Sequence, residues 1–181
     1  MDFRVSSSQD LTQILAVHAA AFGGRKGEEI ANLVNDLLVD DTALPLLSLI
    51  ATENNNIIGH IIFSKAKISN PDQAVSTVIL APLAIQPEFQ CRGIGGKLIK
   101  YGLAELQTTG VELVFVLGHP TYYPKHGFCV AGKHGFDAPY PIPAEHANAW
   151  MIQELRPGLI GRIKGRVQCS DVLNQPQHWR E

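Results

Sequence analysis

A short stretch near the middle of the chain, "QPEFQCRGIGGKL", could bind an anion through its main chain. Directly before an apolar run with helical spacing it holds three glycines: Gly93, Gly95 and Gly96. A turn that leads from a strand into a helix leaves several backbone N–H groups unpaired, and the helix dipole adds roughly half a positive charge there. Arg92 and Lys97 would strengthen that field. The stretch therefore predicts a cradle for a bulky anion such as a pyrophosphate.

Other interpretations of this turn remain open. Its glycine spacing matches neither GxxxxGK[ST] nor GxGxxG, which disfavours Walker-type and Rossmann-type dinucleotide sites. A phosphate- or nucleotide-binding protein with an unusual loop stays an alternative. So does a purely structural turn, in which glycine only lets a helix cross closely over a strand. The residues of the turn alone do not separate the structural from the anion-binding interpretation.

The composition is that of a globular protein. The chain has 181 residues, of which 45% are hydrophobic and 18% charged, so we expect one domain over residues 1–181 with a substantial core. The net charge of −2 favours neither nucleic-acid nor membrane-surface binding. Cys91, Cys129 and Cys169 form no CxxC pair, so we expect no metal site and a reducing compartment. Because neither a signal peptide nor a membrane-spanning run is recognisable, we expect a cytoplasmic protein.

Helical spacing dominates the first part of the chain. A short alternating strand begins near Phe3, and a helix is expected to follow over residues 11–22 and to end at Gly23 and Gly24. A second helix is expected over residues 27–40, where apolar side chains form one face.

Strands come before the glycine turn. Two strand-like runs over residues 46–68 are joined by the turn-forming "ENNN", and a polar stretch follows around Asn70, Pro71 and Asp72. The run "STVILAPLAI" then predicts a buried strand in which Pro82 should cause a bulge or local unpairing.

A helix from Gly95 to Leu106 follows the turn, and "VELVFVLG" after it predicts another strand. A short helical turn in "HPTYYPKHGF", a strand at Phe128 and a strand in "WMIQEL" come next, before a loop-like tail. The order β-αα-βββ-α-β-α-β predicts a mixed α/β fold around a central sheet.

Two motifs on these elements carry a resemblance to a known family. "LAIQPEFQCRGIGGKLI" resembles the Q/R-x-x-G-x-G/A signature of the GNAT superfamily of N-acetyltransferases, with Gln90, Gly93 and Gly95 at the signature positions. "YYPKHGF" is similar to the Y-x-x-x-G-F element of that superfamily, with Tyr123 four residues before Gly127. Together with "GHIIFS" and "APYPIP", these motifs resemble the YhbS-like branch. The resemblance implies the GNAT fold, a single mixed central sheet with splayed central parallel strands flanked by helices.

The resemblance further implies acetyl-CoA as co-substrate. The residues it assigns to cofactor binding lie on one strand and on the turn after it: Leu83, Ala84, Ile85, Gln90, Cys91, Arg92, Gly93, Ile94, Gly95, Gly96 and Lys97. The amides from Arg92 to Lys97 would hold the pyrophosphate, and the edge of the strand would pair with the pantetheine arm. An N–H at Leu83 or Ala84 would polarise the thioester carbonyl. Pro82 and Pro87 would help to leave that edge unpaired.

Tyr123 takes the position of the general acid that would protonate the leaving thiolate. The alternative is that both tyrosines of the pair only pack, and Tyr122 is expected to be a core residue. Several members of the superfamily carry a glutamate about eleven residues before the signature glutamine, and this chain has Ile79 there. The remaining candidates for a general base are Glu28, Glu29, His60 and His119, each of which also has a structural interpretation.

The function implied is transfer of an acetyl group to a small-molecule or protein amine, by direct attack within a ternary complex. The missing strand carboxylate supports an alternative, a non-catalytic acyl-CoA-binding or sensor module with the same fold. The acceptor cannot be read from the sequence, and a homodimer is compatible with it.

Overall fold

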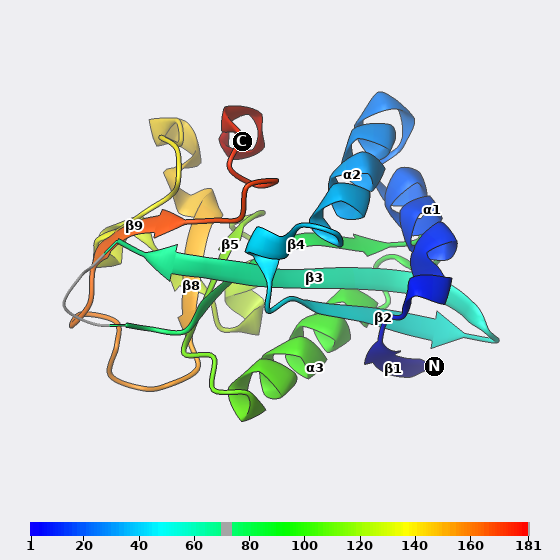
Figure 1. The fold of residues 1–181 in the computed structure, drawn as a ribbon, viewed down its shortest axis with the longest axis horizontal. Coiled ribbons are helices and arrows are strands. Elements are labelled where there is room, and N and C mark those ends of the chain that lie inside the picture. Colours follow the sequence, from blue (N-terminus) through cyan, green and yellow to red (C-terminus); the bar gives the residue numbers. More distant parts are fainter. Residues whose placement is uncertain (70–73, 181) are drawn as a thin grey trace.

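The computed structural model describes residues 1–69 and 74–180, so the polar stretch expected around residues 70–72 lies outside the described residues. Its strands form one open mixed sheet (Figure 1). They are β1 (Asp2–Val5), β2 (Leu47–Glu53), β3 (Asn56–Ile68), β4 (Thr77–Ile85), β5 (Leu113–Leu117), β6 (Cys129–Val130), β7 (Phe136–Asp137), β8 (Trp150–Glu154) and β9 (Gly165–Gln168). The order across the sheet is β1-β2-β3-β4-β5-β8-β6, and β9 pairs with β3 and β7. The expected mixed α/β architecture is confirmed.

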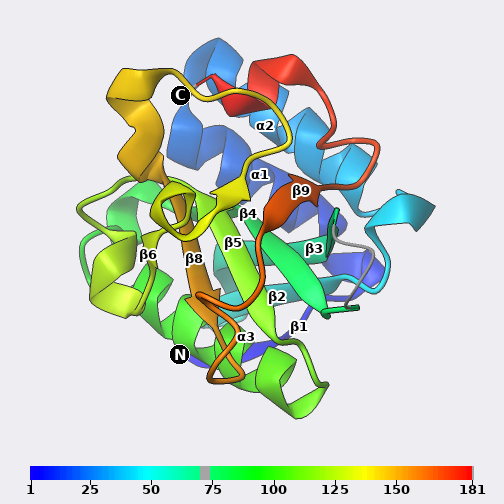
Figure 2. The same ribbon diagram turned by 90° about the vertical axis from the view of Figure 1, so that its left-hand side faces the viewer.

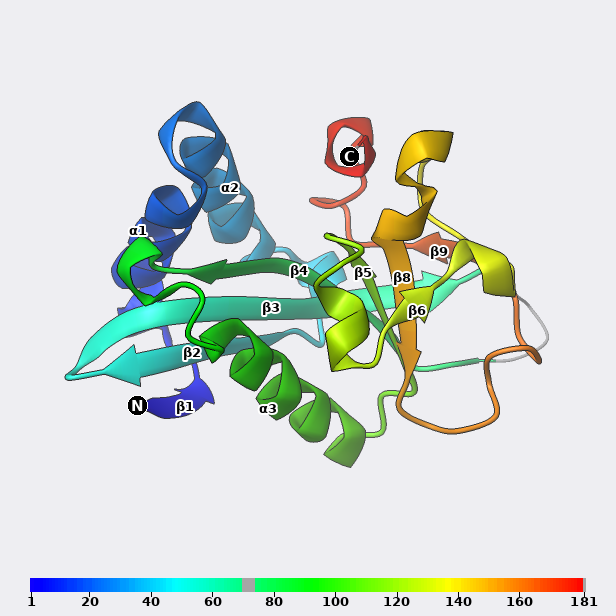
Figure 3. The same cartoon turned by 180° about the vertical axis from the view of Figure 1, so that it is seen from behind.

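Helices cover both faces of this sheet (Figures 1 and 3). Helices α1 (Leu11–Phe22) and α2 (Gly24–Leu37) lie on one face, and α3 (Ile94–Thr108) lies on the other. Helix α2 begins at Gly24, three residues earlier than expected, because Gly23 alone turns the chain with a φ of 68°. A Cβ on Gly27 would collide with the Ala19 carbonyl oxygen, so glycine at this position lets α1 and α2 pack closely.

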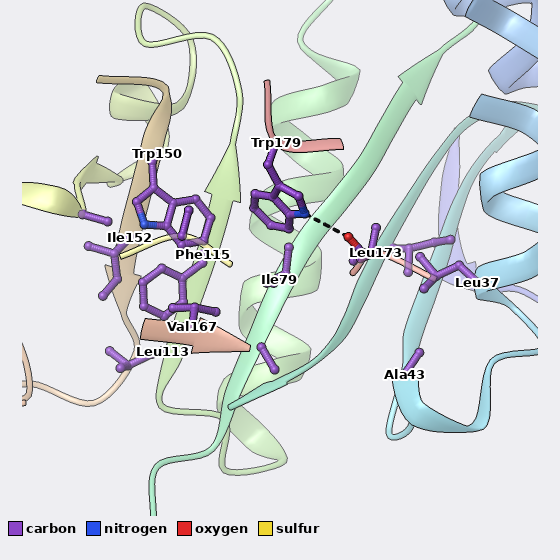
Figure 4. Close-up of a cluster of buried hydrophobic side chains, with 14 of the residues drawn as sticks. Leu37, Ala43, Ile79, Leu113, Phe115, Trp150, Ile152, Val167, Leu173 and Trp179 are labelled. Atoms are coloured by element: carbon purple, nitrogen blue, oxygen red, sulfur yellow. Dashed lines mark hydrogen bonds between the residues drawn. The ribbon is translucent and has the colours of Figure 1, made fainter. Parts of the chain in front are cut away.

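Each face of the sheet has its own apolar cluster. One cluster lies on the α1 and α2 side and includes Phe115, Trp150 and Trp179 (Figure 4). The other packs under α3 and includes Phe63, Leu98 and Tyr123. Together the clusters fix α1 and α3 to opposite sides of β3 and β4.

The C-terminal tail is more ordered than its sequence suggested. It contains β9 and a short 3-10 helix, Pro176–Trp179, where a loop was expected. The buried Trp179 indole donates to the Leu173 carbonyl at 2.9 Å (Figure 4). Backbone N–H groups at Asp171 and Val172 donate to Thr42 and Asp40, which places the tail beside the end of α2 (Figure 2). Tertiary contacts of this kind leave no periodic pattern in the sequence.

Two sequence expectations about the strands before the glycine turn are confirmed. Asn54 and Asn55 join β2 to β3 with φ values of 50° and 64°, the left-handed pair that a two-residue hairpin turn requires. In β4, Ala81 and Pro82 together face Ile62 of β3, which is the bulge that Pro82 predicted.

The central parallel strands part at this bulge. β4 pairs with β5 from Thr77 to Leu80, which face Leu113 to Val116. Beyond Leu80, β4 continues to Ile85 paired with β3, while β5 runs on beside β8 (Figure 3). Among the described residues, the last part of β4 therefore has a partner strand on one side only.

Candidate active site

The unpaired edge of β4 is the first part of the site. The Gln86 N–H donates to the Ile58 carbonyl of β3 at 2.8 Å. Since successive backbone groups along a strand point to opposite sides, the N–H groups of Leu83 and Ile85 point away from β3. Consistent with this, the Ile85 carbonyl accepts a hydrogen bond from the Gln90 side chain at 3.0 Å. The N–H groups of Leu83 and Ala84 were the two expected to polarise the thioester carbonyl. Because the N–H of Ala84 points toward β3, the direction of the backbone groups favours Leu83.

The glycine turn forms the second part of the site, next to this edge. Cys91 and Gly93 both take left-handed conformations, with φ values of 60° and 78°, and helix α3 begins directly after them. The helix has no side-chain cap, and its hydrogen-bond ladder opens with the Lys97 N–H donating to the Gly93 carbonyl at 3.1 Å. The amides of residues 94–96 precede that ladder, so they are available to an anion.

Not all three glycines serve the same purpose. A Cβ on Gly93 would meet no atom within 4 Å, so this side of the turn is open. A Cβ on Gly95 would lie 2.6 Å from the Tyr122 hydroxyl, and one on Gly96 would lie 2.6 Å from the His126 ring. Gly95 and Gly96 thus let the segment around the 3-10 helix Tyr123–His126 pack on α3, and the open approach is at Gly93.

Two basic side chains, Arg92 and Lys97, flank the glycine turn. The Arg92 guanidinium lies 5.3 Å from the centre of the Phe89 ring, a cation–π contact that holds it beside the turn. Lys97 is exposed on the first turn of α3. A free strand edge, uncapped amides and two cations fit the chemistry of a pantetheine arm ending in a pyrophosphate.

Tyr123 lies beside the end of β5. Its ring packs against Gly118, which follows β5 and where a Cβ would collide with it. Only 8% of the residue is exposed, and burial raises the pKa of its phenol above the ordinary value. Tyr122, expected in the core, is instead half-buried, with its hydroxyl beside Gly95. The structure therefore offers two phenols near the start of α3, the deeper of which is Tyr123.

The expected candidates for a general base are scattered. Ile79 is 1% exposed within an apolar cluster, so β4 presents no carboxylate at that position. Glu28 and Glu29 are exposed on α2, where Glu29 pairs with Arg25 at 3.3 Å. His119 is exposed after β5. Among the described residues, no hydrogen bond or ion pair joins Glu28 or Glu29 to Tyr123 or the glycine turn, and His119 meets Tyr123 through its backbone carbonyl, which accepts from the Tyr123 N–H at 3.3 Å.

His60 differs from these candidates because it is fully buried on β3 and hydrogen-bonded to another buried histidine, His18 of α1. His18 lies among the buried residues of α1, together with Ile14 and Val17. Since His18 and His60 are 42 positions apart, nothing in the sequence pattern indicates their pairing.

Two hollows lie away from the glycine turn and the tyrosine pair. One is lined by Leu15, Ala16, Ala19, Glu28, Ala31 and Asn32 between α1 and α2, and the other includes Lys65 and Lys67 of β3. Across residues 1–69 and 74–180, no group of three or more metal-ligating side chains is close enough to hold an ion. Within the same ranges, no helix is both long and apolar enough to cross a bilayer.

Comparison with known proteins identifies the family to which this fold and site belong. The family described as "Acetyltransferase (GNAT) domain" matches residues 2–131, which is more than half of the chain. The "Uncharacterized N-acetyltransferase YjhQ" of Escherichia coli (strain K12) is 43% identical over 171 residues, covering 93% of this chain and 92% of the relative.

Two solved structures share the architecture. The crystal structure of YhbS from Escherichia coli in complex with CoA has a TM-score of 0.85 at 26% identity, covering 96% of this chain and 92% of that one. A GNAT family acetyltransferase from Brucella melitensis, in complex with acetyl-CoA, has a TM-score of 0.73 at 28% identity, covering 95% and 97%. The parted strands, the uncapped helix and these matches lead to one conclusion, that the chain belongs to the GNAT family of acetyltransferases.

Proposed function

We propose that this GNAT acetyltransferase moves an acetyl group from acetyl-CoA to an amine by direct attack within a ternary complex. The observation that carries the proposal is the one-sided pairing of β4 beyond its bulge, which ends at the uncapped start of α3. Both close structural relatives were solved with CoA or acetyl-CoA, which supports the same donor here. The acceptor class is an amine of a small molecule or a protein.

The main chain would do most of the binding. The edge from Leu83 to Ile85 would pair with the pantetheine arm, and the amides around Gly93 would hold the pyrophosphate. Gln90 supports both parts, because its side chain ties the turn to the Ile85 carbonyl. The Leu83 N–H would then stabilise the negative charge that develops on the thioester oxygen.

Tyr123 would act on the leaving sulfur. Its raised pKa keeps the phenol protonated at neutral pH, so a donor is always present. The reference pKa of a thiol, about 8.5, lies below that of a phenol, about 10, so complete proton transfer is uphill. We therefore assign Tyr123 a hydrogen bond to the sulfur that strengthens as charge develops, with the proton following late.

Substitution at the tyrosine pair tests this role. Tyr123→Phe should lower kcat by roughly 10-fold to 100-fold and leave the CoA-induced rise in Tm unchanged. Tyr122→Phe is the matched control, because it removes the neighbouring hydroxyl. An unchanged kcat in Tyr123→Phe would remove that residue from the acid role, and a loss confined to Tyr122→Phe would transfer the role to Tyr122.

The second candidate is an acyl-CoA-binding or sensor module with the same fold. The buried Ile79, which stands where several members of the superfamily carry a glutamate, favours it. Thiol release from acetyl-CoA, followed with ethanolamine, lysine amide, spermidine and a lysine-containing peptide, separates the two functions. CoA-dependent stabilisation without release above the buffer rate would establish the sensor, and stabilisation by ATP or NAD instead of CoA would overturn both.

A further inference from the structure

Four buried or half-buried polar side chains form a continuous hydrogen-bonded chain through the α1 side of the sheet. Nε2 of His18 lies 2.7 Å from Nδ1 of His60, and Nε2 of His60 lies 2.8 Å from Oγ of Ser48. Oγ of Ser48 in turn lies 2.6 Å from Oγ of Ser6, which is half-buried after β1. The two histidines are fully buried, so the chain runs from the interior toward the surface.

One end of this chain has no partner. Nδ1 of His18 is buried and makes no hydrogen bond within the described part of the chain. An unpaired buried polar atom costs about 1–3 kcal/mol, so its retention calls for an explanation. The exposed ring of Phe22 lies parallel to the His18 ring, with 6.4 Å between ring centres. The ring that carries the unpaired nitrogen therefore lies beside an exposed aromatic side chain.

The chain lies against the strand that would hold the acetyl group. His60 is directly opposite Ala84 in the β3–β4 pairing, next to Leu83. Helix α1, which carries His18, packs on both β3 and β4 (Figure 1). The unpaired nitrogen is thus on the helix that covers the outer half of β4, on the opposite face from α3.

Burial favours neutral imidazoles in this chain. The Asp10 carboxylate acts in the opposite direction and raises the pKa of His60, but it is already paired with Arg4 at 2.8 Å. Burial lowers the pKa of His18 to about 4 and that of His60 well below its ordinary value. A base that must store a proton would suit this site poorly. A chain that passes protons on while each ring stays neutral suits it well, because no buried charge has to form.

We propose that His18, His60, Ser48 and Ser6 form a proton relay for acetyl transfer, with Nδ1 of His18 as the substrate-side end. The proposal rests on the proposed function. As the amine nitrogen bonds to the thioester carbon and the carbon–sulfur bond breaks, the sulfur leaves as the CoA thiolate, hydrogen-bonded to Tyr123, and the amine proton passes to Nδ1 of His18. The Nε2 proton of His18 moves to Nδ1 of His60, and the Nε2 proton of His60 moves to Ser48. Ser48 passes its proton to Ser6 and Ser6 releases one to water, so both rings change tautomer and neither gains net charge.

Conservative variants test the relay. His18→Gln keeps a side chain that can bond to His60 but cannot transfer a proton between two ring nitrogens. We expect kcat with ethanolamine, lysine amide or spermidine to fall roughly 100-fold, while the KM for acetyl-CoA and the CoA-induced rise in Tm stay unchanged. Ser48→Ala should lower kcat less, because water can replace a hydroxyl. Ser64→Ala is the matched control: it removes another buried hydroxyl of the sheet, on β3, one without a hydrogen-bond partner in the described residues.

Solvent isotope effects distinguish a relay from a structural tie. Several protons in flight give a curved dependence of kcat on the deuterium fraction in the wild-type protein, and His18→Gln should make that dependence linear. Imidazole added to His18→Ala should restore at least part of the lost rate.

Each outcome decides one of the two proposals. A folded His18→Gln variant with the kcat of Ser64→Ala would overturn the relay, and so would a loss of acetyl-CoA affinity that accounts for the whole rate defect. Failure of the wild-type protein to release thiol with any of the amines, despite stabilisation by CoA, would overturn the proposed function, and the relay with it.

Discussion

The hydroxyl oxygen of Tyr122 occupies the space that a side chain on Gly95 would need, since a Cβ built there would lie 2.6 Å from it. This contact joins the first turn of α3 to the segment that carries Tyr123. The stability of the site therefore depends on glycine at position 95, whatever binds there.

Gly95→Ala should destabilise the fold by about 1–3 kcal/mol, because an added methyl group overpacks this contact. Tyr122→Phe should recover most of that loss, because the next atom of the tyrosine, Cζ, would be 3.7 Å from the new Cβ. Urea denaturation of both single variants and the double variant measures the coupling. Gly132→Ala is the control, since a Cβ there meets no atom within 4 Å. Additive effects at positions 95 and 122 would show that the contact is not tight in solution.

Lys97→Gln should weaken CoA binding roughly fivefold at low salt, because Lys97 is exposed beside the uncapped amides of α3. Lys100→Gln removes the same charge one turn further along the helix and should have a smaller effect. Calorimetric titration with CoA at low and high ionic strength measures both variants, and the difference between them should shrink as salt screens the charges. Equal losses in the two variants would indicate a general effect of net charge.

The His18–His60 pair should make the fold less stable as the pH falls. The ordinary pKa of histidine is 6.5, and burial lowers the pKa of His18 to about 4. Between these two values His18 is protonated in the unfolded chain and neutral in the folded one, so a falling pH favours unfolding. The contribution of His18 to the free energy of unfolding is therefore fully present above pH 6.5 and is lost progressively as the pH falls toward 4. At about 1.4 kcal/mol per pKa unit, His18 alone contributes roughly 3 kcal/mol to that loss.

Denaturation of wild-type protein and His18→Gln between pH 8 and pH 4 measures this contribution. The variant should lose less stability over the range, since it has one buried titrating ring fewer. The pKa of the Asp10 carboxyl is lowered by its hydrogen bonds with Arg4, so its own contribution is lost only at more acidic pH. Parallel curves for the two proteins would contradict a buried neutral His18.

Trp179→Ala should cost roughly 3–5 kcal/mol of stability, which is typical of a large buried aromatic side chain. Trp179 is 3% exposed, packs edge-on against Trp150 and donates a hydrogen bond to Leu173. Thermal denaturation measures the loss, with the exposed neighbour Arg180→Ala as control. A loss below 1 kcal/mol would mean that the tail contributes little to the core.

Much of the fold could be predicted from local pattern. Helical spacing placed α1 and α3, the two asparagines placed the β2–β3 turn, and Pro82 marked the bulge of β4. These features depend on residues close together in the chain, where backbone preferences act directly. The start of α2 and the structure of the tail were missed, because packing against distant residues decides them.

For the site, the sequence by itself determined the family signature and the unpaired amides at the start of α3, since glycine readily takes the left-handed conformation from which the helix begins. Only the tertiary structure decided which partners those residues meet. It assigned Gly95 and Gly96 to Tyr122 and His126, it buried Tyr123 against the end of β5, and it joined His18 to His60 across 42 residues. Such pairings follow from how the helices lie on the sheet, and that arrangement is set by the whole core rather than by any local stretch.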